Sequence, residues 1–287
     1  METATREDRP GASPQMLLSE KEFRRLREFI EEQCGIHLAE QKKSLLEGRI
    51  RKRLRVLGIA GFEAYSSYLF SPEGMAKELE HMIDAVTTNK TDFFREPWHF
   101  EYLTKTVLPA WVREGRRNVR VWSAGCSTGD EPYTLAIYLN EFAGQNPGFS
   151  YSILATDISH EVLAKASEGV YDESKVEPMP YALRKKYLFR SKDPARKLVM
   201  MGPELKSRIE FRRLNLMDGD FGIDKPPDVI FCRNVIIYFT KETQERLIQK
   251  FCRLLLPGGY LFLGHSETIT NMNVPLVYAA ATVYRKA

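Results

Sequence analysis

The chain has 287 residues, a formal net charge of +4, and 28% charged and 43% hydrophobic residues, a composition typical of one or two globular domains. No apolar run approaches the roughly 18 residues that cross a bilayer, so membrane insertion is not expected. The small net charge gives no indication of nucleic-acid binding by itself. The four cysteines form no C-x-x-C pair, so we expect free thiols and no metal site.

Residues 1–15 are charged and contain proline and glycine, without the apolar stretch of a signal peptide. We expect a disordered lead there and, with free thiols, a cytoplasmic protein. Residues 16–87 show helical periodicity and no alternation with period two, which predicts an all-helical domain. Its helices are expected from Ser19, where Ser19 and Glu22 form a capping box, and over 42–57, 62–70 and 73–86.

The second of these helices is strongly basic. Between Gln41 and Gly58 the sequence has seven basic residues and one acid, Glu47. Arg49 shares a helical face with Arg53, and Arg51 shares one with Arg55. After this domain, the segment Thr87–Arg95 surrounds a Phe pair with polar side chains. We expect the Phe pair to anchor a domain-joining turn and Asn89, Thr91 and Arg95 to face a cleft.

The stretch Val119–Tyr133, VRVWSAGCSTGDEPY, predicts a strand, a glycine loop and a helix of a doubly wound α/β sheet. A pyrophosphate site needs bare N–H groups and positive charge at the helix start, yet this loop ends in Asp130 and Glu131. We therefore expect a neutral or cationic ligand group, such as a ribose, or an ammonium beside a sulfonium. The loop Gly125-x-x-x-Gly129 is neither a dinucleotide fingerprint nor a Walker loop. S-Adenosylmethionine fits both observations, because its ammonium and sulfonium suit the two acids and it carries no phosphate.

Alternating strands and helices predict a mostly parallel α/β sheet over the rest of the chain. Strands are expected at 119–123, 151–156, 209–214, 228–232, 260–264 and 276–284, and helices at 132–142, 159–167 and 241–256. The segment 198–205 is too short for a crossover helix and predicts a small hairpin lobe.

Several polar residues follow these strands and have two interpretations each. Asp157 is a ribose ligand, which we favour, or the cap of the helix that begins near Ser159. Glu131 binds the cofactor's ammonium or stabilises the first helical turn. Asn215 faces the adenine or is a solvated loop amide. Asn234 and Tyr238 face the cofactor, or they are a turn residue and a packed ring.

Six blocks in order, TTNKTDFFREPWHF, VWSAGCSTGDEPYTLAIYL, ATDISHEVLAKA, FRRLNL, FCRNVIIYF and LFLGHSE, closely resemble the CheR-type chemotaxis receptor methyltransferases, and the likeness extends over nearly the whole chain from about Ser19. The resemblance implies a Rossmann-like class I S-adenosylmethionine-dependent methyltransferase domain over 119–287, with a small hairpin lobe at about 190–207. An all-α domain, 16–87, and a linker and cofactor-capping segment, 88–118, precede it.

The resemblance also implies an activity. The family transfers a methyl group from S-adenosylmethionine, leaving S-adenosylhomocysteine, to glutamate carboxylates on the cytoplasmic helices of membrane chemoreceptors. By motif position, the implied cofactor-binding residues are Asn89, Thr91, Arg95, Gly125, Glu131, Asp157, Asn215, Leu216, Asn234 and Val235. Arg95 and Tyr238 match the active centre. Since a glutamate is already an anion at neutral pH, no general base is needed. Arg95 then orients the carboxylate of either substrate or cofactor.

The partners follow from the same resemblance. Receptor helices are acidic, so we expect the basic helix to dock against them rather than to be only a solvated face. The expected docking residues are Arg49, Arg51, Lys52, Arg53 and Arg55. Some members bind a receptor-tail pentapeptide through the lobe, but here the loop 191–197 is short and lacks glycine, so we expect no dependence on it.

Two alternatives from other functional classes are also compatible with the sequence. One is a non-catalytic module that senses S-adenosylmethionine. The other is a nucleic-acid methyltransferase, which the absence of an Asn/Asp-Pro-Pro-aromatic site after the fourth strand disfavours. We expect a monomer that binds no nucleic acid. His265 and Ser266 belong to the family pattern without a role beyond structure, and His37, His81, His99 and His160 give no functional signal.

Overall fold

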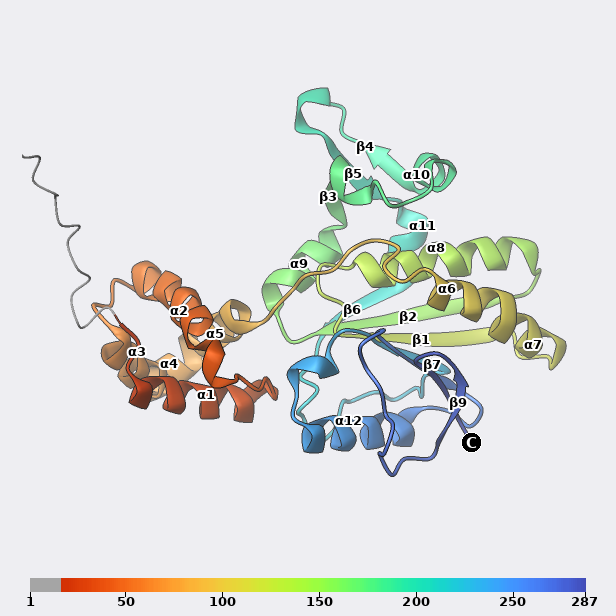
Figure 1. Cartoon of the computed structure of the whole chain (residues 1–287). Helices are drawn as coiled ribbons and strands as arrows, with labels where there is room; N and C mark the ends of the chain where they lie inside the picture. Colours follow the sequence, from red (N-terminus) through yellow and green to blue (C-terminus); the bar gives the residue numbers. More distant parts are fainter. Residues whose placement is uncertain (1–16) are drawn as a thin grey trace, which may run out of the picture. The chain divides into compact units, whose positions relative to one another are not determined.

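The computed structural model describes residues 17–287 (Figure 1). The lead predicted for residues 1–15 lies outside the described residues. The described chain divides into a helical unit, which comprises the residues up to Gln33 and His37–Val86, and a larger unit of Cys34–Ile36 and Thr87–Ala287. Within residues 17–287, no helix is both long and apolar enough to span a membrane.

The helical unit is built from short amphipathic helices around a common core. They are α1 (Glu20–Cys34), η2 (Glu40–Lys42), α2 (Lys43–Leu57), α3 (Phe62–Leu69), α4 (Pro72–Lys77) and α5 (Leu79–Val86). The predicted capping box begins α1, where Ser19 Oγ accepts the Glu22 N–H at 3.2 Å. The single helix predicted over 73–86 is wrong. The chain breaks at Glu78, whose buried carboxylate accepts hydrogen bonds from Tyr65 and Arg53 inside the core.

A seven-stranded sheet forms the centre of the larger unit. Its strands are β1 (Asn118–Ala124), β2 (Ser150–Asp157), β6 (Ile209–Arg213), β7 (Val229–Cys232), β8 (Tyr260–Leu263), β9 (Leu276–Ala280) and β10 (Val283–Lys286). Their order is β6-β2-β1-β7-β8-β10-β9, parallel from β6 to β8, with β10 antiparallel to both neighbours. The first five predicted strands are confirmed to within one residue at each end. The last, predicted as one strand over 276–284, is a hairpin that turns at Thr282, whose φ is 52°.

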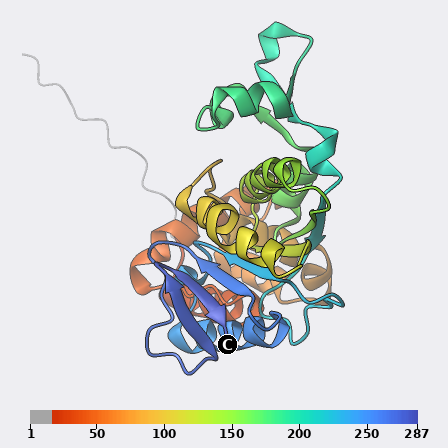
Figure 2. The ribbon, with the colours of Figure 1, turned by 90° about the vertical axis from the view of Figure 1, so that its right-hand side faces the viewer.

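Helices cover both faces of this sheet (Figure 1, Figure 2). They include α8 (Asp130–Gln145), α9 (His160–Glu168) and α12 (Lys241–Leu254). Because side chains alternate along a strand, Val121 of β1 belongs to the core shared with α8, and Trp122 to the core shared with α12. This confirms the mostly parallel α/β architecture.

The segment predicted as a linker, 88–118, is largely helical. It contains α6 (Trp98–Tyr102), a π-helical turn, η3 (Leu103–Val107), and α7 (Leu108–Arg113). Phe100, Leu103, Val107 and Trp111 are buried in the core of the sheet. The interpretation of 98–113 as linker was therefore wrong. Two prolines at the ends of short helices, Pro97 and Pro109, conceal the periodicity.

The small lobe is a three-stranded antiparallel sheet in the order β3-β5-β4, with short helices around it. Its elements are β3 (Val170–Asp172), η4 (Glu173–Val176), α10 (Tyr181–Tyr187), β4 (Leu188–Arg190), η5 (Pro194–Arg196), β5 (Leu198–Met201) and α11 (Pro203–Lys206). The predicted hairpin is present as β4 and β5, but the lobe begins at Val170 rather than near residue 190. Gly169, with φ 63°, ends α9 and turns the chain directly into β3.

Candidate cofactor-binding and active site

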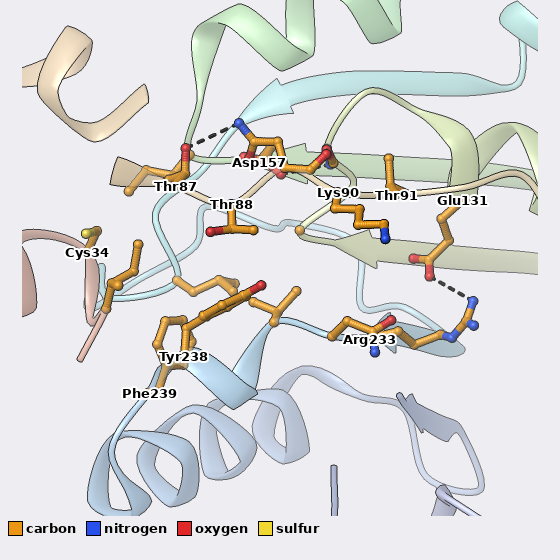
Figure 3. A pocket seen from close by; sticks show the side chains of 18 of the residues that line it. Cys34, Thr87, Thr88, Lys90, Thr91, Glu131, Asp157, Arg233, Tyr238 and Phe239 are labelled. Atoms are coloured by element: carbon orange, nitrogen blue, oxygen red, sulfur yellow. Dashed lines mark hydrogen bonds and ion pairs between the residues drawn. The ribbon is translucent and has the colours of Figure 1, made fainter. Parts of the chain in front are cut away.

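A pocket with about 970 Å³ of empty space, part of it open to solvent, lies in the larger unit at the carboxyl ends of β1, β2 and β7 (Figure 3). The sheet extends from β1 through β2 to β6 on one side and from β7 to β8 on the other. Open α/β sheets bind ligands at such a switch point. The residues predicted for cofactor binding and catalysis all line this one pocket, namely Asn89, Thr91, Arg95, Gly125, Glu131, Asp157, Asn215, Leu216, Asn234, Val235 and Tyr238.

The glycine loop follows β1 as predicted and makes a sharp turn. The backbone N–H groups of Gly125 and Cys126 both donate to Thr156 O, at 2.8 and 2.9 Å, which ties the loop to β2. Gly125 has φ 85°, and a Cβ there would lie 2.4 Å from Val235 Cγ2. The position therefore needs glycine both for its backbone conformation and for close packing. Helix α8 begins at Asp130, two residues before the start predicted at Pro132.

Asp157 joins two turns of the pocket wall. Its Oδ2 accepts the Ser127 N–H at 2.8 Å, and its Oδ1 accepts the Ser159 N–H at 3.0 Å. The cap of α9 is Ser159, whose Oγ accepts the Val162 N–H, so the interpretation of Asp157 as that cap was wrong. A carboxylate accepts more than two hydrogen bonds, so Asp157 can take ribose hydroxyls while both backbone bonds persist.

Glu131 faces a buried cation that the sequence analysis did not select. Ser123 Oγ donates to Glu131 Oε1 at 2.7 Å, and Arg233 Nη1 donates to Glu131 Oε2 at 3.2 Å. Burial raises the pKa of the Glu131 carboxyl above its usual value, and the Arg233 guanidinium opposes that shift. The Arg233 side chain is only 2% exposed. Neither a motif nor periodicity indicates its role, because the partners of Arg233 are more than 100 residues away in the sequence.

Arg233 also holds the turn that carries Arg95. Its Nη2 donates to Arg95 O at 2.6 Å and to Glu96 Oε2 at 3.0 Å. Phe94 and Glu96, on either side of Arg95, have φ values of 57° and 52°, which non-glycine residues rarely adopt. The Arg95 side chain itself is 38% exposed, and its Nη1 lies 3.5 Å from Lys90 O. Arg233 therefore fixes the backbone of the turn, while the Arg95 guanidinium remains accessible.

Glu267, a buried acid that was not among the predicted site residues, organises the loop after β7. Its carboxylate accepts N–H groups from Gly264 at 2.6 Å, from Asn234 and Val235 at 2.8 Å, and from Ile237 at 3.3 Å. These bonds hold Asn234 at φ 59°. Burial raises the Glu267 pKa, and the four N–H donors oppose the shift. His265 and Ser266 were expected to be structural, whereas no role was predicted for the neighbouring Glu267.

The remaining pocket walls come from two loops after strands. After β6, Asn215 Oδ1 accepts the Met217 N–H at 3.0 Å, and Leu216 is buried beside it. After β7, Tyr238 and Phe239 lie across the pocket from Asp157 (Figure 3). On the linker side, Ser127 Oγ donates to Asn89 O at 2.9 Å, so the Asn89–Arg95 segment is attached to the glycine loop.

Two cysteines and one histidine in or near the pocket are buried, and their pKa values are shifted away from the neutral range. Burial raises the pKa of Cys34 to about 11 and that of Cys126 well above its usual value. Burial and the Arg233 charge lower the pKa of His99 to about 3, so this imidazole is neutral. These pKa shifts keep both thiols protonated and His99 neutral near neutral pH, which argues against a thiolate nucleophile or an imidazolium acid at these positions.

The pocket's chemistry fits S-adenosylmethionine. Glu131 and Asp157 give negative charge at the glycine loop, which suits an ammonium, a sulfonium and ribose hydroxyls and disfavours a phosphate. Ile36, Ile158, Leu214, Leu216 and Phe239 supply apolar surface for an adenine. The space lies within the range of small-ligand pockets.

The basic residues of α2 have different surroundings. Arg53 makes two hydrogen bonds to the buried Glu78, Nε–Oε1 2.8 Å and Nη2–Oε2 2.7 Å, and Arg49 donates to Val86 O. Arg51 pairs with Glu47 on the same helix. Lys52 and Arg55 are exposed. The structure thus separates cations that stabilise the helical unit from cations that face solvent.

Comparison with known proteins agrees with the fold and the pocket. A family model described as the CheR methyltransferase SAM-binding domain matches residues 89–284, and one described as the CheR methyltransferase all-alpha domain matches residues 21–87. A chemotaxis protein methyltransferase of Borreliella burgdorferi is 40% identical over 94% of this chain and 95% of its own length. One of Salmonella typhimurium is 39% identical over 94% and 91%, and one of Escherichia coli 37% over 94% and 92%.

A doubly wound sheet with an acid-bearing glycine loop, matched by these models, defines the protein as an S-adenosylmethionine-dependent methyltransferase. The matches cover both units and nearly the full length of the relatives. The chain belongs to the CheR methyltransferase family, as the sequence resemblance predicted.

Proposed function

We propose that this enzyme transfers the methyl group of S-adenosylmethionine to glutamate side chains on the cytoplasmic helices of membrane chemoreceptors, forming the methyl esters used in chemotactic adaptation. The observation that carries the proposal is one pocket whose walls combine the cofactor-type acids Glu131 and Asp157 with an accessible arginine, Arg95, and a tyrosine, Tyr238. A carboxylate nucleophile needs an orienting cation and no general base.

The cofactor is assigned to the pocket by the chemistry of its walls. Asp157 binds the ribose hydroxyls, and Glu131 binds the ammonium of the amino-acid end. Asn215 and Leu216 hold the adenine, while Asn234 and Val235 contact the cofactor from the loop that Glu267 fixes. Gly125 lets the backbone approach closely, and Asn89, Thr91 and Arg95 close the pocket from the linker side.

Methyl transfer then depends on alignment. Bound S-adenosylmethionine supplies an electrophilic methyl group on a sulfonium. Arg95 orients the incoming carboxylate by a charge-assisted hydrogen bond from its accessible guanidinium. This hold must be moderate, because the nucleophile loses negative charge as the ester forms, and the partial exposure of Arg95 keeps it moderate. Tyr238 faces the same space and restricts the approach of the carboxylate.

The receptor is recognised by the basic helix α2. Arg53 and Arg49 form hydrogen bonds within the helical unit, so the proposed docking residues are reduced to Arg51, Lys52 and Arg55. These residues lie within two turns of one helix and carry the positive charge that an acidic receptor helix requires.

The enzyme acts in the cytoplasm as a monomer and does not bind nucleic acid.

The lobe does not need a receptor-tail pentapeptide. The loop between β4 and β5 is closed by the short helix η5, and Lys197 takes the left-handed conformation there, with φ 46°, in place of a glycine. This short turn supports independence from the tether. Calorimetry with a receptor-tail pentapeptide should detect no micromolar binding.

One assay separates the proposed function from its alternatives. The enzyme is incubated with methyl-labelled S-adenosylmethionine and receptor-containing membranes, and base-labile methyl ester is counted. We expect labelled receptor, and a large loss of label with Arg95→Ala. Cofactor binding without transfer to any receptor would favour the sensing module, and label in added nucleic acid would favour a nucleic-acid methyltransferase.

A further inference from the structure

The base of the small lobe touches the cofactor-binding loop from outside the pocket. Tyr171 of β3 donates its hydroxyl to Thr128 O at 2.7 Å. Lys175 of η4 donates to Thr128 Oγ1 at 2.9 Å and to Asp130 Oδ2 at 3.1 Å. Thr128 and Asp130 are the end of the glycine loop and the first residue of α8. Two lobe residues therefore contact the same short stretch that precedes Glu131.

The contact is buried and closely packed. Asp130 is 0% exposed, and among residues 17–287 its Oδ1 accepts no hydrogen bond but forms an ion pair with the Lys175 ammonium at 3.1 Å. Burial raises the Asp130 pKa, and the Lys175 charge opposes that shift. A Cβ on Gly129 would lie 2.9 Å from Tyr171 Oη. The Tyr171 ring also meets Phe93 edge-on, with centroids 5.0 Å apart. The lobe thus braces both the loop and the Phe93 anchor of the linker.

We infer that Tyr171 and Lys175 are positioning residues for cofactor binding. Neither lines the pocket as the structure describes it. They fix the loop on which Ser127 meets Asp157, and the first turn of α8, which carries Glu131. This inference rests on the cofactor use of the family and not on the receptor substrate proposed above. It gives the lobe a role inside the enzyme even where no receptor peptide binds it.

The test is calorimetric titration of the purified full chain with S-adenosylmethionine and S-adenosylhomocysteine. Lys175→Met should weaken binding about tenfold, or about 1.4 kcal/mol, because the buried Asp130 loses its counter-charge. Tyr171→Phe, which removes one oxygen atom, should weaken it about threefold. Lys186→Met is the matched control. Lys186 also links the lobe to α8, through Glu141 at 2.6 Å, but near the other end of the helix.

Wild-type affinity in both Lys175→Met and Tyr171→Phe would overturn the inference, as would an equal loss in Lys186→Met. The double variant Lys175→Met/Asp130→Asn removes the uncompensated charge and should recover part of the affinity. If it recovers none, Lys175 does not act through Asp130. Tyr171→Phe keeps the test valid if Lys175→Met folds poorly. Receptor methylation is not measured, so failure here leaves the proposed function untouched.

Discussion

The cofactor pocket was predicted from residues at strand ends and from the family resemblance, and the docking face of α2 from its positive charge. The two sets of predicted residues lie differently in the structure. In the pocket, every predicted residue lines the same space. On α2, Arg53 and Arg49 turn to partners inside the helical unit, and Lys52 and Arg55 remain exposed. Most pocket residues follow strand ends, which the sheet brings together, while Asn89, Thr91 and Arg95 reach the pocket from the linker segment. Helix residues point in all directions, and composition does not indicate which face is buried.

The largest effect is expected on stability, when a cation that faces the core of the helical unit is removed. Arg53→Ala leaves the Glu78 carboxylate, 1% exposed, without its guanidinium. We expect the free energy of unfolding to fall by about 3–5 kcal/mol. Urea unfolding measures it, with Arg55→Ala as the control, which should change stability by less than about 0.5 kcal/mol. Equal effects of the two variants would remove the distinction between inner and outer cations.

Next comes Asp157, which holds two backbone N–H groups and, as we propose, the ribose. Asp157→Ala should weaken S-adenosylmethionine binding about 10–100-fold, since hydrogen bonds to charged groups contribute about 1.5–3 kcal/mol. Calorimetry measures the affinity. Asp193 is a suitable control, because it caps η5 through Ala195 N–H in the lobe, and Asp193→Ala should bind the cofactor normally.

The pH dependence of stability tests whether burial keeps the His99 imidazole neutral in the folded protein. Its pKa is lowered to about 3, mainly by burial and then by Arg233. The unfolded imidazole titrates near 6.5, so as pH falls below about 6.5 the unfolded state binds the proton and stability decreases. The wild type should lose about 1.4 kcal/mol per pH unit more than His99→Gln between about pH 6 and 4. Parallel stability curves for the two proteins would show that His99 is not held neutral.

Much of the larger unit was predictable because strand ends carry local signals. The five parallel strands follow from apolar runs, and the polar residues Asp157 and Asn234 stand out at the ends of two of them. The rest of the pocket set, including Asn89, Thr91 and Arg95, was implied by the family resemblance. The residues that hold these positions were not predictable. Arg233 and Glu267 act through backbone groups distant in sequence, and a lone charged residue gives no sign of being buried. The helices over 98–113 were missed because prolines interrupt short apolar stripes.

A smaller effect is expected at the outer face of α2. Arg55→Glu reverses an exposed charge, so stability should hardly change, while the apparent KM for receptor methylation should rise severalfold, or about 1 kcal/mol. The KM for S-adenosylmethionine should stay constant. The rise should also shrink as salt is added, because exposed charges are screened. A KM that ignores both the reversal and the salt would place receptor docking elsewhere.

The smallest effect concerns Gly48, which lies in the middle of α2 on the face of Arg51, Lys52 and Arg55. A Cβ added at Gly48 would meet no neighbouring atom of residues 17–287 within 4 Å. Glycine there costs the helix about 0.5–1 kcal/mol relative to alanine. Gly48→Ala should therefore stabilise the enzyme by that amount.

If a receptor helix packs closely on this face, the same Gly48→Ala variant should raise the receptor KM about twofold, or about 0.4 kcal/mol. Gly144→Ala in α8, also in open space, is the control and should stabilise the enzyme without changing KM. Higher stability together with weaker receptor affinity, seen in Gly48→Ala and not in Gly144→Ala, would assign Gly48 to docking. A purely structural role of this glycine would change the stability only.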